Sequence, residues 1–192
     1  MRRFSSWQSY KRETPRPAGA GAVRASVRVL GLDPGSRITG YGVVETGSDR
    51  PRYVASGAIR AGEGDFTRRL QEIYRGVAAL VLEHRPDEIA IEKVFVSRNP
   101  DSALKLGQAR GAAISATFGS NAPLFEYTPR EVKLGLVGTG AADKLQVQRM
   151  VVALLALEGR LGVDASDALA IALCHAHGRA LRHALAAAGA GA

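Results

Sequence analysis

Four acidic residues border apolar segments, where an unpaired carboxylate is unfavourable. Asp33 and Glu92 each end a short apolar run, Asp167 immediately precedes the apolar stretch 168–173, and Asp164 lies three residues before Asp167. A carboxylate at the end of a core element must find a cation or take up a proton, because burying the bare charge costs too much free energy. Oxygen ligands of this kind suit Mg²⁺ or Mn²⁺. The chemistry they predict is phosphoryl transfer, in which two ions about 3.5–4 Å apart activate a water and stabilise the leaving oxygen.

Each acid also has a simpler explanation. Asp33 is a plausible turn residue before Pro34-Gly35, and Glu92 a surface charge at a strand end. Asp164 suits the N-cap of a helix, and Asp167 adds negative charge to the first helical turn. The two lie at i and i+3 and therefore share one face of that helix. Four such residues on converging elements favour a metal site.

The expected elements bring the acids to one edge of a sheet. Segment 88–92 follows a crossover helix, so it should pair parallel to the first strand. Parallel neighbours present their carboxyl ends side by side, where open α/β folds place active sites. The fold class is therefore α/β, a five-stranded mixed sheet of three antiparallel strands and then two parallel ones, with helices on both faces. We expect strands at 27–32, 38–45, 52–60, 88–92 and 124–127, and helices at 66–85, 101–118, 129–136, 143–157 and 164–184, with a break at 138–140.

Composition predicts one domain and little bulk charge on it. The chain has 192 residues, 46% of them hydrophobic, and a net charge of +8. Residues 1–26 carry six basic residues and one acid, 6 − 1 = +5, which leaves 20 − 17 = +3 for the rest. We expect a basic, disordered leader (1–26), a single folded domain (27–184) and a frayed Ala/Gly tail (185–192). The lone Cys174 excludes an intrachain disulfide, and no apolar run reaches the roughly 18 residues of a membrane span.

Several motifs together resemble the RuvC family of Holliday-junction resolvases, which have an RNase H-like fold. The resemblance covers roughly 28–178 and rests on LGLDPGS (30–36), TGYG (39–42), AIEKVF (90–95), SALKLGQARG (102–111), YTPREVK (127–133), VGTG (137–140), Lys144 and DASDALA (164–170). It implies that Asp33, Glu92, Asp164 and Asp167 hold two Mg²⁺ ions, or Mn²⁺, and that Lys144 serves the catalytic site. It also implies symmetric nicking of two opposing junction strands, a RuvA–RuvB branch-migration partner and a bacterial cytoplasm.

The resemblance also implies residues that contact DNA. Phe95 would stack on a base, although core packing is the simpler explanation. Lys133 and Lys144 would contact phosphates near the site, as point charges. The wider backbone groove would include Arg98, Lys105 and Arg110, which are otherwise ordinary surface charges. His175 lies too far along its helix to join the metal site, so we expect it to be structural.

Small residues recur at a spacing of four on the second long helix: Ala103, Gly107, Gly111 and Ser115. A glycine inside a helix costs about 1 kcal/mol relative to alanine, which suggests a compensating close contact. One explanation is packing on the protein's own sheet. The family resemblance favours a homodimer interface, which would present two active sites to a four-way junction.

Two other functions fit parts of the sequence. Segment 33–40 is similar to the phosphate loop of actin-like ATPases and sugar kinases, but two such halves are needed to clamp ATP. A non-catalytic junction-binding module is the second alternative. It would leave four carboxylates beside DNA without neutralisation, and they would repel the phosphates.

Overall fold

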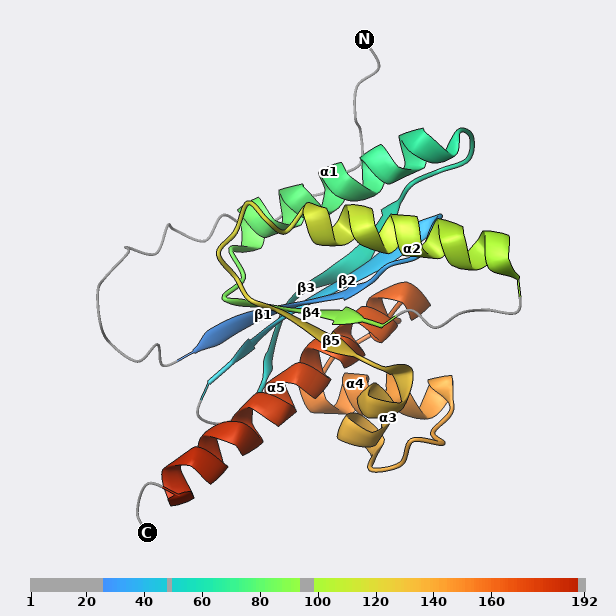
Figure 1. Ribbon diagram of the computed structural model, residues 1–192. Helices are drawn as coiled ribbons and strands as arrows, with labels where there is room; N and C mark the ends of the chain where they lie inside the picture. Colours follow the sequence, from blue (N-terminus) through green and yellow to red (C-terminus); the bar gives the residue numbers. More distant parts are fainter. Residues whose placement is uncertain (1–25, 48–49, 94–98, 190–192) are drawn as a thin grey trace.

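The structure, a computed structural model, describes residues 26–47, 50–93 and 99–189 (Figure 1). The predicted leader therefore lies outside the described residues except for Ser26, and so do Phe95 and Arg98. Within these ranges the strands are β1 (Val27–Asp33), β2 (Ile38–Thr46), β3 (Arg52–Arg60), β4 (Glu88–Glu92) and β5 (Leu124–Tyr127). The helices are α1 (Phe66–His84), α2 (Pro100–Ser115), α3 (Pro129–Val137), α4 (Lys144–Leu155) and α5 (Val163–Gly189).

The strands form one mixed sheet in the order β3-β2-β1-β4-β5. β1 pairs antiparallel with β2, and β2 with β3. β4 is parallel to both β1 and β5. The predicted architecture of three antiparallel strands followed by two parallel ones is confirmed.

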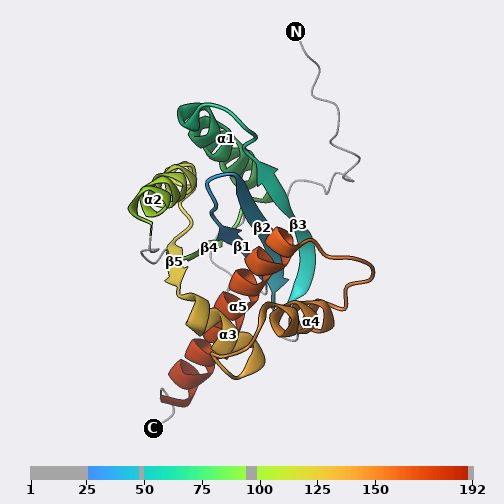
Figure 2. The same cartoon turned by 90° about the vertical axis from the view of Figure 1, so that its right-hand side faces the viewer.

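Helices cover both faces of this sheet (Figures 1 and 2). Side chains alternate along each strand, so Leu30 and Ile91 join the apolar cluster that also includes buried residues of α1 and α2. Val29 and Ala90 join the cluster on the opposite face, with α3, α4 and α5. Asp33 and Glu92 follow Val29 and Ala90 at even spacing, so both belong to the α5 face.

Glycines let α5 approach the sheet closely. A Cβ at Gly31 would lie 2.2 Å from the carbonyl oxygen of Ala168, and one at Gly40 would lie 2.2 Å from that of Asp164. Only the missing side chains make room for the helix backbone. The N-terminal turn of α5 is therefore held directly over β2, beside the end of β1.

Several element ends differ from the predictions. α2 ends at Ser115 instead of continuing to Phe118, because a short turn follows in which the Thr117 hydroxyl donates to the carbonyl of Ile114 at 2.7 Å. α5 continues to Gly189, five residues beyond the predicted end, in an alanine-rich segment with high helix propensity. The break expected at 138–140 is the C-terminal end of α3, where Gly138 adopts φ +80°. No helix within the described ranges is long and apolar enough to cross a membrane.

Candidate active site

Two acidic side chains meet at the carboxyl ends of neighbouring strands. Leu32 of β1 pairs with Ile91 of β4 in parallel register, so the next residues, Asp33 and Glu92, follow side by side. Their side chains share a hydrogen bond. The prediction that these two acids come together is confirmed.

The other two acids come from the first turn of α5. Asp33 pairs with Gly40 across β1 and β2, and Gly40 is the residue over which the backbone of Asp164 lies. Asp167 lies one turn further along, and its charge acts on both Asp33 and Glu92. α5 begins at Val163, so Asp164 lies inside the first turn and is not the N-cap residue. The simpler explanation of Asp164 as an N-cap is therefore wrong.

Lys144 brings a positive charge to the same cluster. It is the first residue of α4, whose start is fixed by a capping box between Asp143 and Gln146. Its ammonium donates to the Asp167 carboxylate at 3.2 Å. The Asp167 charge and this hydrogen bond raise the pKa of Lys144. The lysine therefore stays charged and neutralises part of the acidic cluster.

Crowding of carboxylates changes their proton affinity. The pKa of Glu92 is raised to about 7, first by burial, then by the charge of Asp33 and the shared hydrogen bond, then by Asp167. Burial and Asp167 also raise the pKa of Asp33, although the hydrogen bond from Glu92 opposes this. A protonated Glu92 that donates to an ionised Asp33 explains why the shared hydrogen bond raises the pKa of Glu92 and lowers that of Asp33. Crowding therefore makes the ionised form of both carboxyls less favourable.

The donor set suits a hard divalent cation. Four carboxylates face one lysine, which leaves an excess of negative charge that oxygen-seeking ions such as Mg²⁺ neutralise. Among the described residues, no three acidic, histidine or cysteine side chains converge closely enough to hold a metal ion as they stand. The Lys144–Asp167 ion pair offsets part of this excess. The residues therefore fit a metal in donor chemistry and charge.

The predicted DNA-contact residues have varied surroundings. Lys133 is half-buried on α3. Lys105 forms an ion pair with Asp101 at 2.6 Å along α2. Arg110, whose side chain is 19% exposed, donates to the backbone carbonyl of Glu92 at 3.1 Å and pairs with Glu126. Sequence reasoning placed Arg110 in a DNA groove and missed these contacts, which depend on how α2 lies against the sheet.

The small residues of α2 face away from the protein's own sheet. Gly107, Gly111 and Ser115 are exposed, and a Cβ at either glycine would meet nothing within 4 Å. The alternative explanation, packing of these residues on the protein's own sheet, is therefore wrong for Gly107, Gly111 and Ser115. Leu104, on the same helix, is 62% exposed.

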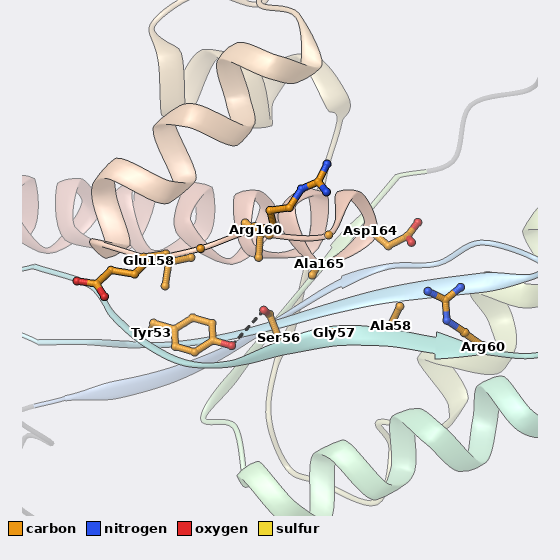
Figure 3. A pocket seen from close by; sticks show the side chains of 13 residues that line it. Tyr53, Ser56, Gly57, Ala58, Arg60, Glu158, Arg160, Asp164 and Ala165 are labelled. Atoms are coloured by element: carbon orange, nitrogen blue, oxygen red, sulfur yellow. Dashed lines mark hydrogen bonds between the residues drawn. The ribbon is translucent and has the colours of Figure 1, made fainter. Parts of the chain in front are cut away.

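Sequence reasoning also missed a groove that opens beside Asp164. It has a volume of about 460 Å³ and runs between β3, the segment 157–162 and the start of α5. Asp164 and Arg60 lie at one end, Tyr53 and Glu158 at the other, and Arg160 on the wall between them (Figure 3). Arg60 and Arg160 are a hundred residues apart in sequence, so no local pattern could have joined them.

His175 lies in a buried polar network on the same face of the sheet. Its ring nitrogens contact the Tyr127 hydroxyl at 2.7 Å and the Glu88 carboxylate at 2.5 Å. Arg179 donates to the same carboxylate at 3.0 Å. The expectation that His175 is structural is confirmed, since its hydrogen bonds tie α5 to β4 and β5.

Together, the sheet order, the two helical layers and the acidic edge define an RNase H-like nuclease. A family model described as crossover junction endodeoxyribonuclease RuvC matches residues 29–175. The chain belongs to the RuvC family of crossover junction endodeoxyribonucleases, which are metal-dependent nucleases.

Individual relatives agree with this assignment. The RuvC of Alkalilimnicola ehrlichii is 58% identical over 150 residues, which are 78% of this chain and 91% of that protein. The RuvC of Marinobacter nauticus is 58% identical over 149 residues, 78% and 85% of the two chains. A solved structure of Thermus thermophilus RuvC in complex with a Holliday junction substrate has a TM-score of 0.74 and 33% identity, and covers 79% of this chain and 93% of that one. The yeast mitochondrial resolvase Ydc2, at 13% identity and a TM-score of 0.61, shares the fold.

Proposed function

We propose that this protein resolves Holliday junctions by nicking two opposing strands symmetrically, with Mg²⁺ held by Asp33, Glu92, Asp164 and Asp167. The observation that carries the proposal is the placement of these acids at one sheet edge, with Asp33 and Glu92 on neighbouring strand ends, the start of α5 packed over Gly40, and Lys144 paired with Asp167. Mn²⁺ would substitute, because the same hard oxygen donors suit it. Two ions per site would match the four carboxylates available.

Bound Mg²⁺ would supply a water nucleophile at neutral pH and neutralise charge on the phosphate in the transition state. The protein's strands and helices fix the positions of the carboxylates that would hold the metal. β1 and β4 fix the backbones of Asp33 and Glu92 side by side, and the glycine contact at Gly40 fixes the height of Asp164 above them. Lys144 is 79% exposed at its side chain and can meet a phosphate while it pairs with Asp167.

DNA would approach over the exposed side of this edge. Lys133 and Lys144 would contact phosphates close to the cut, and the groove lined by Arg60 and Arg160 gives the strand a path beside Asp164. Phe95, Arg98 and Lys105 remain predicted DNA contacts.

A homodimer across α2 would supply the second active site that a two-strand cut needs. The exposed face of Gly107, Gly111 and Ser115 allows a second helix to come close, and the adjacent exposed Leu104 offers apolar area. A two-fold axis through this face would match the symmetry of a four-way junction. We also propose a RuvA–RuvB branch-migration partner and a cytoplasmic location, both by family resemblance.

Cleavage of a labelled four-way junction, with and without Mg²⁺ and against linear duplex, tests the proposal. The wild type should cut only the junction, only with the metal, and leave ligatable 5′-phosphate and 3′-hydroxyl ends. Asp33→Asn should keep junction binding and lose cleavage. Unchanged cleavage by Asp33→Asn would rule out its role as a metal ligand, and junction binding without any Mg²⁺-dependent cut would favour a non-catalytic binding module.

A further inference from the structure

Helix α2 buries little apolar surface against the sheet. Its buried residues are Ala109 and Ala113, whose side chains are single methyl groups. Small side chains contribute little hydrophobic stabilisation, because that stabilisation grows with the apolar area removed from water. Ala112 and Ile114 add half-buried contacts to the apolar cluster on this face of the sheet, and polar contacts also help to fix where α2 lies.

Arg110 makes such contacts with the ends of two strands. Its Nε donates to the backbone carbonyl of Glu92 at 3.1 Å, at the end of β4. Its Nη2 pairs with Glu126 of β5, which lies opposite Ile91 in the sheet register. The planar guanidinium thus spans β4 and β5 with bonds in two directions, a geometry that lysine cannot reproduce.

Glu92 is consequently held from both faces of the sheet. Its carboxylate reaches Asp33 on the α5 face, while its carbonyl accepts the bond from Arg110 of α2. Immediately afterwards, the Lys93 amide donates to the Tyr127 carbonyl at 2.7 Å, just beyond the ends of β4 and β5. The Arg110 bond therefore constrains the peptide where regular pairing stops.

Arg69 of α1 makes a comparable contact beside the other strand-borne acid. Its Nη1 donates to the carbonyl of Ser36 at 3.2 Å, in the turn that follows Asp33. An arginine from the α1–α2 layer thus contacts the backbone of Glu92 itself, and another contacts the turn three residues after Asp33. The recurrence indicates that this helical layer orients the strand ends.

We infer that Arg110 is a positioning residue for Glu92. It fixes the end of β4 so that the Glu92 carboxylate points to the metal site. The inference rests on the proposed role of Glu92 as a metal ligand. Residues that orient metal ligands typically change metal affinity or activity by about 10–100-fold when removed.

The test compares Arg110→Ala and Arg110→Lys with wild type in three measurements: Mn²⁺ affinity by electron paramagnetic resonance, junction affinity without divalent metal, and the nicking rate at saturating junction. In Arg110→Ala we expect Mn²⁺ affinity and nicking rate to fall about 10–100-fold, with junction affinity unchanged. Arg110→Lys keeps the charge, but lysine cannot span both partners. Its Mn²⁺ affinity and nicking rate should therefore lie between those of wild type and Arg110→Ala. All measurements are made well below each variant's Tm, so that an effect on positioning is not confused with loss of the fold. If Arg110→Ala does not fold, Arg110→Lys alone tests the inference.

Arg75→Ala is the matched control, since Arg75 is exposed on α1 and forms an exposed i,i+3 pair with Glu72. It should match wild type in all three measurements. Wild-type Mn²⁺ affinity and nicking in folded Arg110 variants would overturn the inference. Weaker junction binding with a smaller salt dependence would overturn it in favour of a direct phosphate contact. A wild type that fails to cut junctions would contradict the proposed function, while the Mn²⁺ affinities would still decide the role of Arg110.

Discussion

The Lys144 ammonium lies 3.2 Å from the Asp167 carboxylate, across the start of two different helices. Asp167 also acts on Asp33 and Glu92, so the lysine offsets part of the repulsion inside the cluster. A metal ion at the acids would compete with this ion pair. We therefore predict that the same lysine opposes metal binding in the free protein and supports phosphate binding during the reaction.

Lys144→Met should separate these two roles. We expect Mn²⁺ to bind several-fold more tightly in the free variant, because the carboxylates lose their competing cation. Junction cleavage should fall about 100–1,000-fold, the usual scale for losing one electrostatic contact to the reacting group. Titration with Mn²⁺ and single-turnover cleavage measure the two effects. Weaker Mn²⁺ binding in Lys144→Met would show that the lysine does not compete with the metal.

The groove beside Asp164 predicts a salt-dependent contribution to DNA binding. Replacing both Arg60 and Arg160 by alanine should weaken junction binding and reduce the slope of log affinity against log salt by about one to two units, as expected for lost phosphate contacts. Gel-shift titrations without divalent metal, at three salt concentrations, measure this. Arg68, an exposed residue of α1 outside the groove, provides the alanine control. An unchanged slope in the double variant would exclude the groove as a path for the strand.

Sequence alone predicts the acidic edge because its causes are local. Strand ends, a crossover helix and an i,i+3 pair are all visible along the chain, and parallel pairing brings Asp33 beside Glu92. The contact of Arg110 with the Glu92 carbonyl has no local cause. It depends on how close α2 comes to the sheet, which follows from the packing of Ala109 and Ala113. Tertiary distance of this kind is not encoded in periodicity or motif spacing.

Gly40 should tolerate no side chain. A Cβ there would lie 2.2 Å from the Asp164 carbonyl oxygen, so Gly40→Ala must push α5 away from β2. We expect a loss of about 1–3 kcal/mol in the free energy of unfolding, typical of overpacking, and a larger proportional loss of cleavage because Asp164 and Asp167 move. Urea unfolding and junction cleavage measure the two. Gly119→Ala, where a Cβ meets nothing within 4 Å, is the control. Normal cleavage in Gly40→Ala would contradict the close packing of α5.

Glu88 should make the free energy of unfolding depend on pH in the acidic range. Burial alone would raise its pKa, but hydrogen bonds from His175 and Arg179 outweigh burial and lower it. A carboxyl whose folded pKa is depressed contributes stability above its unfolded value near 4.5, and that stability is lost as pH falls through the lower folded value. Glu88→Gln should lose about 1–3 kcal/mol at pH 7 and show a flatter decline below pH 4.5. Urea unfolding between pH 3 and 7 checks this, with the exposed Glu63→Gln as control. An equally steep acid loss in Glu88→Gln would assign that loss to other carboxyls.

Gly107→Leu should convert a dimer into monomers if α2 forms the proposed interface. The glycine is exposed and a Cβ there meets nothing within this chain, so leucine should leave the monomer fold intact and even raise helix propensity. A close helix–helix approach would be blocked by the new side chain. Light scattering should therefore report half the wild-type mass, and junction cleavage should stop at single nicks instead of paired ones. Gln71→Leu, an exposed position on α1, controls for added surface hydrophobicity. A Gly107→Leu dimer of wild-type mass would place the two-fold interface elsewhere on the molecule.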